Sequence, residues 1–399
     1  MASKDLCLKR HYFDWAASAP NESPCQHAPF GNPSSLHSEG RAAKQTLEDA
    51  RRRCAMALNV PAETLYFTSG GTESNSIALF SALTRKGPGR IISSLAEHSS
   101  VREGMETLER MGKSTGKIAV DSNGKVNYQT LAKALNQYGD VRFISVMSVN
   151  NETGAVTDTA SLRDVIRKQP GAPIHFHCDL VQAVGKIPVD IKDWDIDSAS
   201  ISAHKIGGPR GIGLLYLRRP IEIFYTGGGQ EKGIRGGTEN TNGAVELACC
   251  LEKHFFSMDN DKPETTNDLL AANIDQTEQF TRAKTRWKRL ISGLSAMERC
   301  TLIPKERAEN ENWFSPYILQ AAFKDIPGEV MARALDDLGF AVSTGSACSS
   351  SSSERPVLLA MGVNERLRIE GIRISQGWST TEEEIDLLLD AVAEVLKFL

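Results

Sequence analysis

The sequence lacks the features that would assign it to several large classes of protein. Its eight cysteines are scattered and form no CxxC pair, which argues against a disulfide framework and a structural zinc site. No apolar run is long enough to span a membrane, and the N-terminal stretch MASKDLCLKRHYFDW has no apolar core of a secretory signal. The net charge of −4 gives no reason to expect a nucleic-acid partner. We therefore expect a cytoplasmic protein in a reducing compartment, with no membrane or nucleic-acid partner.

The sequence also lacks an internal repeat of the length that solenoids show. Its 40% hydrophobic and 24% charged residues are ordinary for a globular protein, and 399 residues are enough for two domains. The basic run Arg51-Arg52-Arg53 lies on a helical pattern, which predicts a solvent-exposed face. The Ser-rich stretch SACSSSSSERP, residues 346–356, is the low-complexity segment, and it predicts a mobile loop.

What the sequence does contain is an alternation of short apolar runs with polar, glycine-containing turns between residues 64 and 218. The runs are TLYFT, RIISSL, VRFISVMSV, IHFHC, SASIS and GLLYL. Several of the turns lead into helical segments, which predicts an α/β domain with a mostly parallel sheet. The polar segment MDNDKPETT is typical of a domain junction. Beyond it, a long helical stretch, the runs YILQAAF and FAVST and a terminal helix predict a smaller α/β domain, joined by the first residues of the chain.

Polar side chains of functional types follow these predicted strands, at the point where each strand ends. In chain order they are SGGTESN at 69–75, His98, Asn150 and Asn151, Asp179 and Gln182, and His204 and Lys205. Ligands bind at the carboxyl ends of the strands in open α/β sheets. The sequence therefore predicts a single site at this edge.

The turn SGGTES opens a helical segment, and its glycines allow backbone N–H groups to approach an anion at the helix N-terminus. It matches neither a Walker A motif nor GxGxxG, so nucleotide binding has little support. Taken alone, the stretch fits an ordinary strand-to-helix turn equally well.

The run HFHCD raises the alternative of a metal site. On a strand, His175, His177 and Asp179 would share one face, and two histidines with a carboxylate can bind non-haem iron. Three ligands along one straight strand would, however, spread over roughly 13 Å, too far for one ion. We therefore expect no metal, and expect these histidines to be sheet residues with hydrogen-bond partners.

Lys205 follows a predicted strand in the stretch SISAHKIGGPRG. A lysine in a glycine-rich turn is most often a solvated surface residue. A lysine beside an anion-binding turn, a histidine and a carboxylate also suits pyridoxal phosphate. That cofactor requires a lysine for its covalent link, a carboxylate for its ring nitrogen, N–H donors for its phosphate and a flat group over its ring.

The chain resembles the cysteine desulfurases, a branch of the class-V aminotransferases among the fold-type I pyridoxal-phosphate enzymes. The matching motifs run through nearly the whole chain and include FTSGGTESN, HCDLVQAVGK, SAHKIGGPRGIG, RGGTENT, STGSACSS and IRISQGWSTTEEEID. The resemblance implies a large domain at 21–258 with a mostly parallel seven-stranded sheet. It also implies a smaller α/β domain made of 1–20 and 259–399, which carries the catalytic cysteine loop.

The same resemblance implies a role for each site residue. Lys205 would bind pyridoxal 5'-phosphate covalently, Asp179 would pair with its ring nitrogen, Gln182 with its ring hydroxyl, and His98 would stack on the ring. The phosphate would be held by Gly71, Thr72, Ser202 and His204, and by Thr238 of the other subunit of a homodimer. Asn151 and Arg373 would hold the substrate carboxylate, the arginine by a bidentate fork.

Cys348, in GSAC, distinguishes this branch. A lone cysteine among serines could be a small spacer, but in the resemblance it is the nucleophile that takes sulfur from L-cysteine as a persulfide and leaves L-alanine. His98 would donate and accept protons around that step. The sulfur acceptor would be an iron–sulfur scaffold or another sulfur carrier. Selenocysteine lyase and a plain aminotransferase of the same fold are the alternatives, and RGGTENT is reminiscent of the lyase.

The chain departs from the housekeeping members of this family in two places. The link between Pro20 and Phe30 is shorter, and the chain stops at Leu399, soon after the last predicted helix. The resemblance therefore does not extend to the tail by which those members dock the iron–sulfur scaffold protein.

Overall fold

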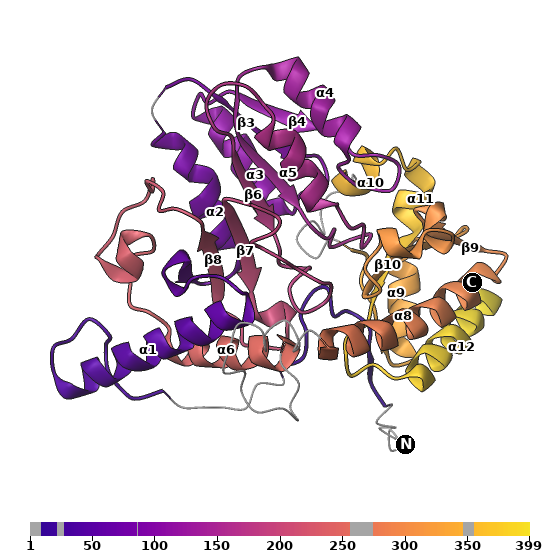
Figure 1. Ribbon diagram of the computed structural model, residues 1–399. Coiled ribbons are helices and arrows are strands. Elements are labelled where there is room, and N and C mark those ends of the chain that lie inside the picture. Colours follow the sequence, from indigo (N-terminus) through magenta and orange to yellow (C-terminus); the bar gives the residue numbers. More distant parts are fainter. Residues whose placement is uncertain (1–8, 22–27, 86, 256–273, 346–354) are drawn as a thin grey trace.

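A computed structural model describes residues 9–21, 28–85, 87–255, 274–345 and 355–399. At its centre is a seven-stranded sheet with the strand order β2-β8-β7-β6-β5-β3-β4 (Figure 1). Its strands are β2 (Leu65–Thr68), β3 (Arg90–Ser94), β4 (Thr115–Ile118), β5 (Val141–Met147), β6 (His175–Asp179), β7 (Ser198–Ser202) and β8 (Gly213–Leu217). Of these strands, β8 alone runs antiparallel to both neighbours. The predicted α/β class with a mostly parallel seven-stranded sheet is confirmed.

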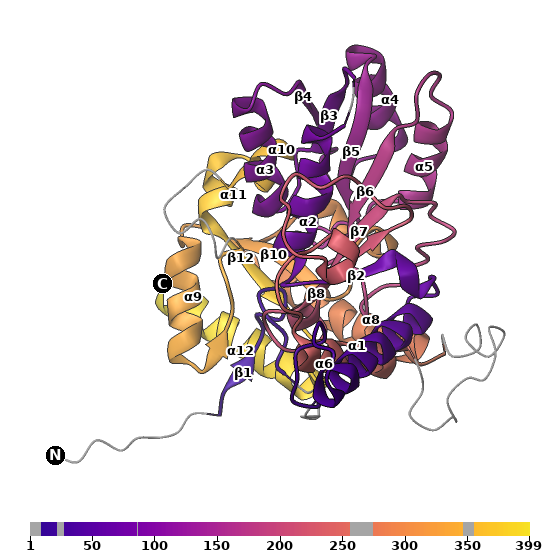
Figure 2. The ribbon, with the colours of Figure 1, turned by 90° about the vertical axis from the view of Figure 1, so that its left-hand side faces the viewer.

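Helices cover both faces of this sheet because successive strand residues point to opposite sides. Tyr66 and Phe143 pack against helices on one face, while Leu65 and Ile144 pack against helices on the other. The first face is covered by α2 (Gly71–Phe80) and α3 (Ser99–Arg110), which lie over the sheet in the view of Figure 2. The second face is covered by α1 (Ser38–Ala57), α4 (Tyr128–Tyr138), α5 (Thr159–Arg167) and α6 (Thr241–Phe255).

A smaller sheet, built from the C-terminal part of the chain, lies beside the large one (orange to yellow in Figure 1). It contains β9 (Cys300–Ile303), β10 (Ile318–Phe323) and β12 (Gly371–Ser375), antiparallel and in the order β12-β10-β9. The strand β1 (His11–Tyr12) pairs in parallel with β11 (Phe340–Ala341). The N-terminal segment is thereby tied to the C-terminal part of the chain.

The C-terminal part of the chain contains α8 (Ile274–Ser295), α9 (Gly328–Asp337), α10 (Pro356–Ala360), α11 (Glu365–Glu370) and α12 (Glu382–Phe398). Of these helices, α8, α9 and α12 enclose an apolar cluster of their own. Trp287 of α8, Leu319 of β10 and Leu388 of α12 belong to this cluster, together with Phe13 from the N-terminal segment. The terminal helix α12 begins with a capping box formed by Thr381 and Glu384.

The apolar runs of the sequence predicted neither β4 of the large sheet nor the strands β1, β9 and β12, and they predicted too long a strand at β11. β4 is an edge strand with the sequence TGKI, and its glycine and lysine interrupt the apolar run by which the other strands were predicted. Gly116 is required there because a Cβ at this position would lie 2.7 Å from the ring of Tyr138. The predicted strand FAVST is reduced to Phe340–Ala341. The predicted junction at 258–266 lies outside the described residues. Within the described ranges, no helix is both long and apolar enough to cross a membrane.

The prediction that Arg51-Arg52-Arg53 forms a solvent-exposed face is wrong. Arg52 is exposed, but Arg51 is buried and donates from Nη1 and Nη2 to the two carboxylate oxygens of Glu231, each at 2.7 Å. The Glu231 carboxylate also accepts a hydrogen bond from the backbone N–H of Phe67 at 2.8 Å. A local sequence pattern cannot predict the burial of Arg51, because the Glu231 carboxylate that compensates its charge is distant in the sequence. The bonds of Glu231 to Arg51 and Phe67 also hold the loop that leads to Thr238 against β2.

Replacing Arg51 by leucine should lower the free energy of unfolding by about 3–5 kcal/mol, because the buried Glu231 carboxylate would lose its charged partner. The matched control is Arg52→Leu, whose exposed ion pair with Asp49 should be worth less than about 1 kcal/mol. Urea unfolding followed by circular dichroism at one protein concentration measures both. Equal losses in the two variants would contradict the assignment of a structural anchor to the Arg51–Glu231 pair.

Candidate active site

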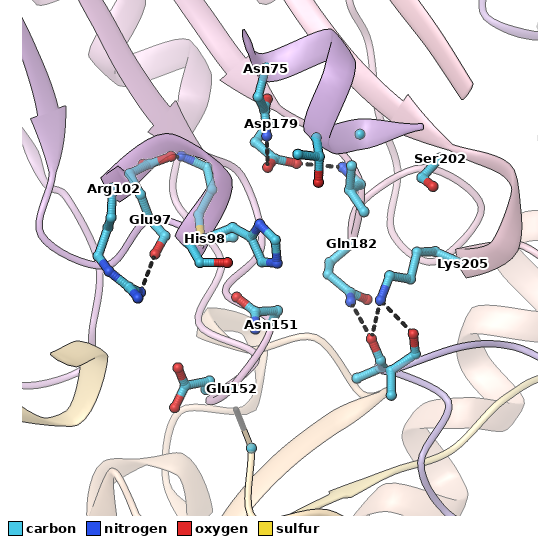
Figure 3. A pocket seen from close by; sticks show the side chains of 18 of the residues that line it. Asn75, Glu97, His98, Arg102, Asn151, Glu152, Asp179, Gln182, Ser202 and Lys205 are labelled. Atoms are coloured by element: carbon cyan, nitrogen blue, oxygen red, sulfur yellow. Dashed lines mark hydrogen bonds between the residues drawn. The ribbon is translucent and has the colours of Figure 1, made fainter. Parts of the chain in front are cut away.

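The carboxyl-terminal edge of the large sheet borders a pocket of about 690 Å³, part of which is shown in Figure 3. Of the predicted site residues, Thr238 does not line it, and Cys348 lies outside the described residues. The predicted residues that line it are Gly71, Thr72, His98, Asn151, Asp179, Gln182, Ser202, His204, Lys205 and Arg373. They come together because parallel strands bring their carboxyl ends to one edge.

Most of these side chains are positioned by the end of a strand or the start of a helix. Thr72 stands in the first turn of α2, directly after β2. His98 is the N-cap of α3, and Asp179 is the last residue of β6. Lys205 ends the short 3-10 helix η3 (Ala203–Lys205) that follows β7. Arg373 comes instead from β12 of the smaller sheet, so both sheets contribute to the pocket.

Lys205 lies in the pocket and not on a solvated turn. Its Nζ donates to the carbonyl oxygens of Ala16 and Ala17, each at 2.7 Å. Gln182 donates from Nε2 to the same Ala16 oxygen at 2.9 Å, which brings the two side chains together (Figure 3). The buried Lys186 in turn donates to Oε1 of Gln182 at 2.6 Å. Burial, followed by the charges of Lys205 and Arg373, holds the pKa of Lys186 well below its usual value.

Asp179 is a buried carboxylate with a partner on each oxygen. Its Oδ1 accepts from the backbone N–H of Val181 at 2.9 Å, and its Oδ2 accepts from the side-chain amide of Asn75 at 2.8 Å (Figure 3). The neighbouring carboxyl of Glu97 is fully buried, and burial together with the charge of Asp179 raises its pKa to about 8. Glu97 is therefore mostly protonated at neutral pH and adds little negative charge to this end of the pocket.

One end of the pocket has the donors of an anion site. The first turn of α2 has no side-chain cap, and its N-cap Gly70 has a φ of +149° that favours glycine. A Cβ on Gly71 would lie 2.6 Å from Cγ2 of Val181, so the close approach of this turn requires glycine. Ser202 and His204 border the same hollow. Burial, followed by the charge of Lys205, lowers the pKa of His204 to about 4, so its ring is neutral at neutral pH.

The opposite end has polar atoms that are buried without a hydrogen-bond partner in the described part of the chain. They include Oδ1 of Asn151 and Nε of Arg373. The guanidinium of Arg373 also donates from Nη2 to Asp14 at 2.8 Å and from Nη1 to the Asn151 carbonyl at 2.9 Å. The arginine is therefore fixed in place, with its Nε edge still able to bind an acceptor.

His175 and His177 take part in hydrogen bonds with Ser198, each at 2.8 Å, and His177 also bonds to Asn75 at 2.9 Å. Within the described ranges, no group of three or more histidine, cysteine or acidic side chains is arranged to hold a metal ion.

Sequence reasoning missed several polar residues around the pocket. Asn75 stands one helical turn after Thr72, and Ser100 follows the N-cap His98 by two residues. Asn75 belongs to the stretch 69–75 that was predicted to reach this edge, although it was not singled out there, and Ser100 could have been found from its place in the first turn of α3. Glu97, Glu152 and Lys186 had no such signal, because their importance comes from burial beside residues distant in the sequence.

Comparison with known proteins agrees with this geometry. The aminotransferase class-V family model matches residues 26–388. Cysteine desulfurase IscS of Dictyoglomus turgidum is 35% identical over 98% of this chain and 95% of its own. A solved NifS-like protein superposes with a TM-score of 0.84 at 32% identity, over 98% of this chain and all of the other.

A further solved structure, described as SspA in complex with cysteine, has a TM-score of 0.73 at 27% identity. It covers 91% of this chain and 98% of its own. Relatives with these names match along nearly the whole length of both chains, as the motif resemblance predicts. The chain therefore belongs to the aminotransferase class-V family, and within it to the cysteine desulfurases.

Proposed function

We propose that the protein is a pyridoxal-phosphate-dependent cysteine desulfurase that converts L-cysteine to L-alanine and takes the sulfur onto Cys348. The observation that carries the proposal is the pocket itself, which is lined by Lys205, by the buried Asp179 and by the start of α2. The matching family and relatives support the same reaction.

The residues of the pocket fit the cofactor. The glycine turn at Gly70 and Gly71, with Thr72, Ser202 and His204 beside it, would hold the phosphate. Asp179 would pair with the ring nitrogen and Gln182 with the ring hydroxyl, while His98 would stack on the ring. Lys205 would bind it covalently. When bound, the cofactor supplies an electron sink for the carbanion that forms at the substrate Cα.

The chain's own residues would do the rest of the chemistry. Arg373 and Asn151, with buried atoms that have no partner in the described ranges, would hold the substrate carboxylate. Lys205 would remove the Cα proton as a general base. The Cys348 thiolate would attack the substrate sulfur, so that an S–S bond forms as the C–S bond breaks. The products are alanine and a persulfide on Cys348.

We also propose a homodimer. Phe224 and Tyr225 are large apolar side chains that are 53% and 81% exposed. With Arg235 they line a surface hollow near Thr238, which is itself exposed. An apolar exposed surface of this kind favours a protein partner. A second copy seated there would allow Thr238 to reach the partner's phosphate site.

We propose further that residues 21–258 form the large domain, and that 1–20 with 259–399 form the smaller one. The parallel pairing of β1 with β11 supports this division. The persulfide would pass to a sulfur-acceptor protein, either an iron–sulfur scaffold or another carrier. A reducing cytoplasmic location is consistent with the five described cysteines, which form no disulfide with one another.

Lys205→Ala should abolish the covalently held cofactor, because the only proposed anchoring amine would be lost. The purified wild type should absorb at the border of the visible and near-ultraviolet regions, and this band should survive gel filtration. The variant should lose the band on the column. Lys192→Ala, at an exposed position, is the control and should keep it. A colourless wild type that gains no absorbance from added pyridoxal phosphate would contradict the proposal.

Cys348→Ser should reduce sulfide release from L-cysteine under reductant by more than about 100-fold, because the nucleophile is removed. It should still bind cysteine and change the absorption spectrum. Cys300→Ser is the matched control, since burial raises the pKa of Cys300 to about 12 and keeps it a poor nucleophile. Full sulfide release by Cys348→Ser would remove this residue from the mechanism. Selenocysteine turnover that survives the substitution would point to a lyase, and an oxo-acid product to an aminotransferase.

A further inference from the structure

The hollow at the start of α2, where the cofactor phosphate would bind, contains few charged side chains. Its volume is about 460 Å³, and of the described residues that line it only Glu73, His204 and Arg210 have side chains that can carry a charge. A phosphate monoester carries a charge of about −1.5 to −2 at neutral pH. The peptide dipoles at the start of a helix supply the equivalent of roughly half a positive charge. Most of the phosphate charge is therefore left for a side chain to compensate.

Neither His204 nor Lys205 supplies that positive charge. Burial, followed by the charge of Lys205, lowers the pKa of His204 to about 4. The neutral ring can donate one hydrogen bond to a phosphate oxygen, but it adds no charge. Lys205 lines the larger pocket and not this hollow, and its Nζ donates to the carbonyl oxygens of Ala16 and Ala17. In the proposed function its amine is used for the covalent link to the cofactor.

Glu73 is the only carboxylate among the described residues that line the hollow, and its charge is already compensated. It stands in the first turn of α2, where Oε2 accepts a hydrogen bond from the backbone N–H of Ser69. Its Oε1 accepts from Nε of Arg235 at 3.3 Å. The charges of Glu73 and Arg235 offset each other, so this pair neither repels a phosphate group nor supplies a cation for one.

Arg210 is the charged side chain that remains. It lies on the loop between η3 and β8, and this loop packs against the turn at the start of α2, because a Cβ on Gly213 would lie 2.6 Å from Cα of Gly70. The side chain of Arg210 is exposed and lines the hollow. Within the described ranges it forms no hydrogen bond or ion pair. After burial and the charges of Lys205 and Lys186, the charge of Arg210 also lowers the pKa of His204, so the guanidinium acts on this hollow.

We propose that Arg210 is a cofactor-binding residue that supplies the positive charge of this phosphate site. The inference rests on the proposed function and adds to it a residue that the family resemblance does not imply. A guanidinium presents its N–H donors in a planar fork that matches two oxygens of a phosphate group. Because Arg210 has no other partner in the described part of the chain, pairing with a phosphate breaks no existing bond.

The test measures the binding of three probes to the full-length protein by isothermal titration calorimetry, after removal of any bound pyridoxal phosphate. The probes are pyridoxal phosphate, pyridoxal, which lacks the phosphate, and inorganic phosphate. Arg210→Gln should weaken the binding of pyridoxal phosphate and of inorganic phosphate by about 10- to 100-fold, the loss expected for a hydrogen bond to a charged group. It should leave the affinity for pyridoxal within about twofold. Arg210→Lys keeps the charge and should recover part of the loss.

The matched control is Arg219→Gln. Arg219 is also exposed, follows the opposite end of β8, and forms no hydrogen bond or ion pair within the described ranges. This variant should leave all three affinities unchanged. Unchanged binding of inorganic phosphate by Arg210→Gln would overturn the inference, as would an equal loss of affinity for pyridoxal, which would indicate a general disturbance of the pocket.

The same measurements separate this inference from the proposed function. A wild type that binds inorganic phosphate through Arg210, but forms no covalent link with pyridoxal phosphate, would contradict the proposed function and leave the positive charge of the phosphate site assigned to Arg210. A wild type that binds neither of the phosphate-bearing probes would overturn both.

Discussion

The structure depends on one buried negative charge at the end of β6. The Asp179 carboxylate is removed from water and is held by one backbone N–H and one side-chain amide. Burying an ionised group is costly unless its oxygens are paired, so the surroundings must be specific. Strand pairing supplies this specificity, since it sets Asp179 opposite Met147 of β5 and Ser200 of β7. A cationic ring nitrogen is the kind of group that such a carboxylate would bind.

The pocket around Asp179 is assembled from elements far apart in the sequence. The large sheet contributes Lys205 and the start of α2, and the smaller sheet contributes Arg373. The N-terminal segment supplies the carbonyl oxygens that hold the Lys205 amine and the carboxylate that holds Arg373. Residues 14–17 therefore support the site structurally, although none of them has a proposed chemical role. The β1–β11 pairing and the Phe13 side chain fix this segment to the C-terminal part of the chain.

The sequence predicted those parts of the molecule that depend on local patterns. The apolar run of β5 and the alternating run of β6 were predicted as strands, together with the polar residues at or after their ends. The four-residue β4 was missed because half of it is glycine and lysine. The burial of Arg51 was missed because its partner, Glu231, is 180 residues away. The hydrogen bond between Asn75 and His177 was not predicted for the same reason, since its two residues are 102 positions apart in the sequence.

The central claim is that one cofactor ring is held between Lys205 and Asp179. A crystal structure of the protein loaded with pyridoxal phosphate tests it most directly. The account predicts Nζ of Lys205 bonded to the aldehyde carbon of the cofactor, and a carboxylate oxygen of Asp179 within about 3 Å of the ring nitrogen. A cofactor bound elsewhere, with Nζ of Lys205 still on the Ala16 and Ala17 carbonyl oxygens, would contradict it.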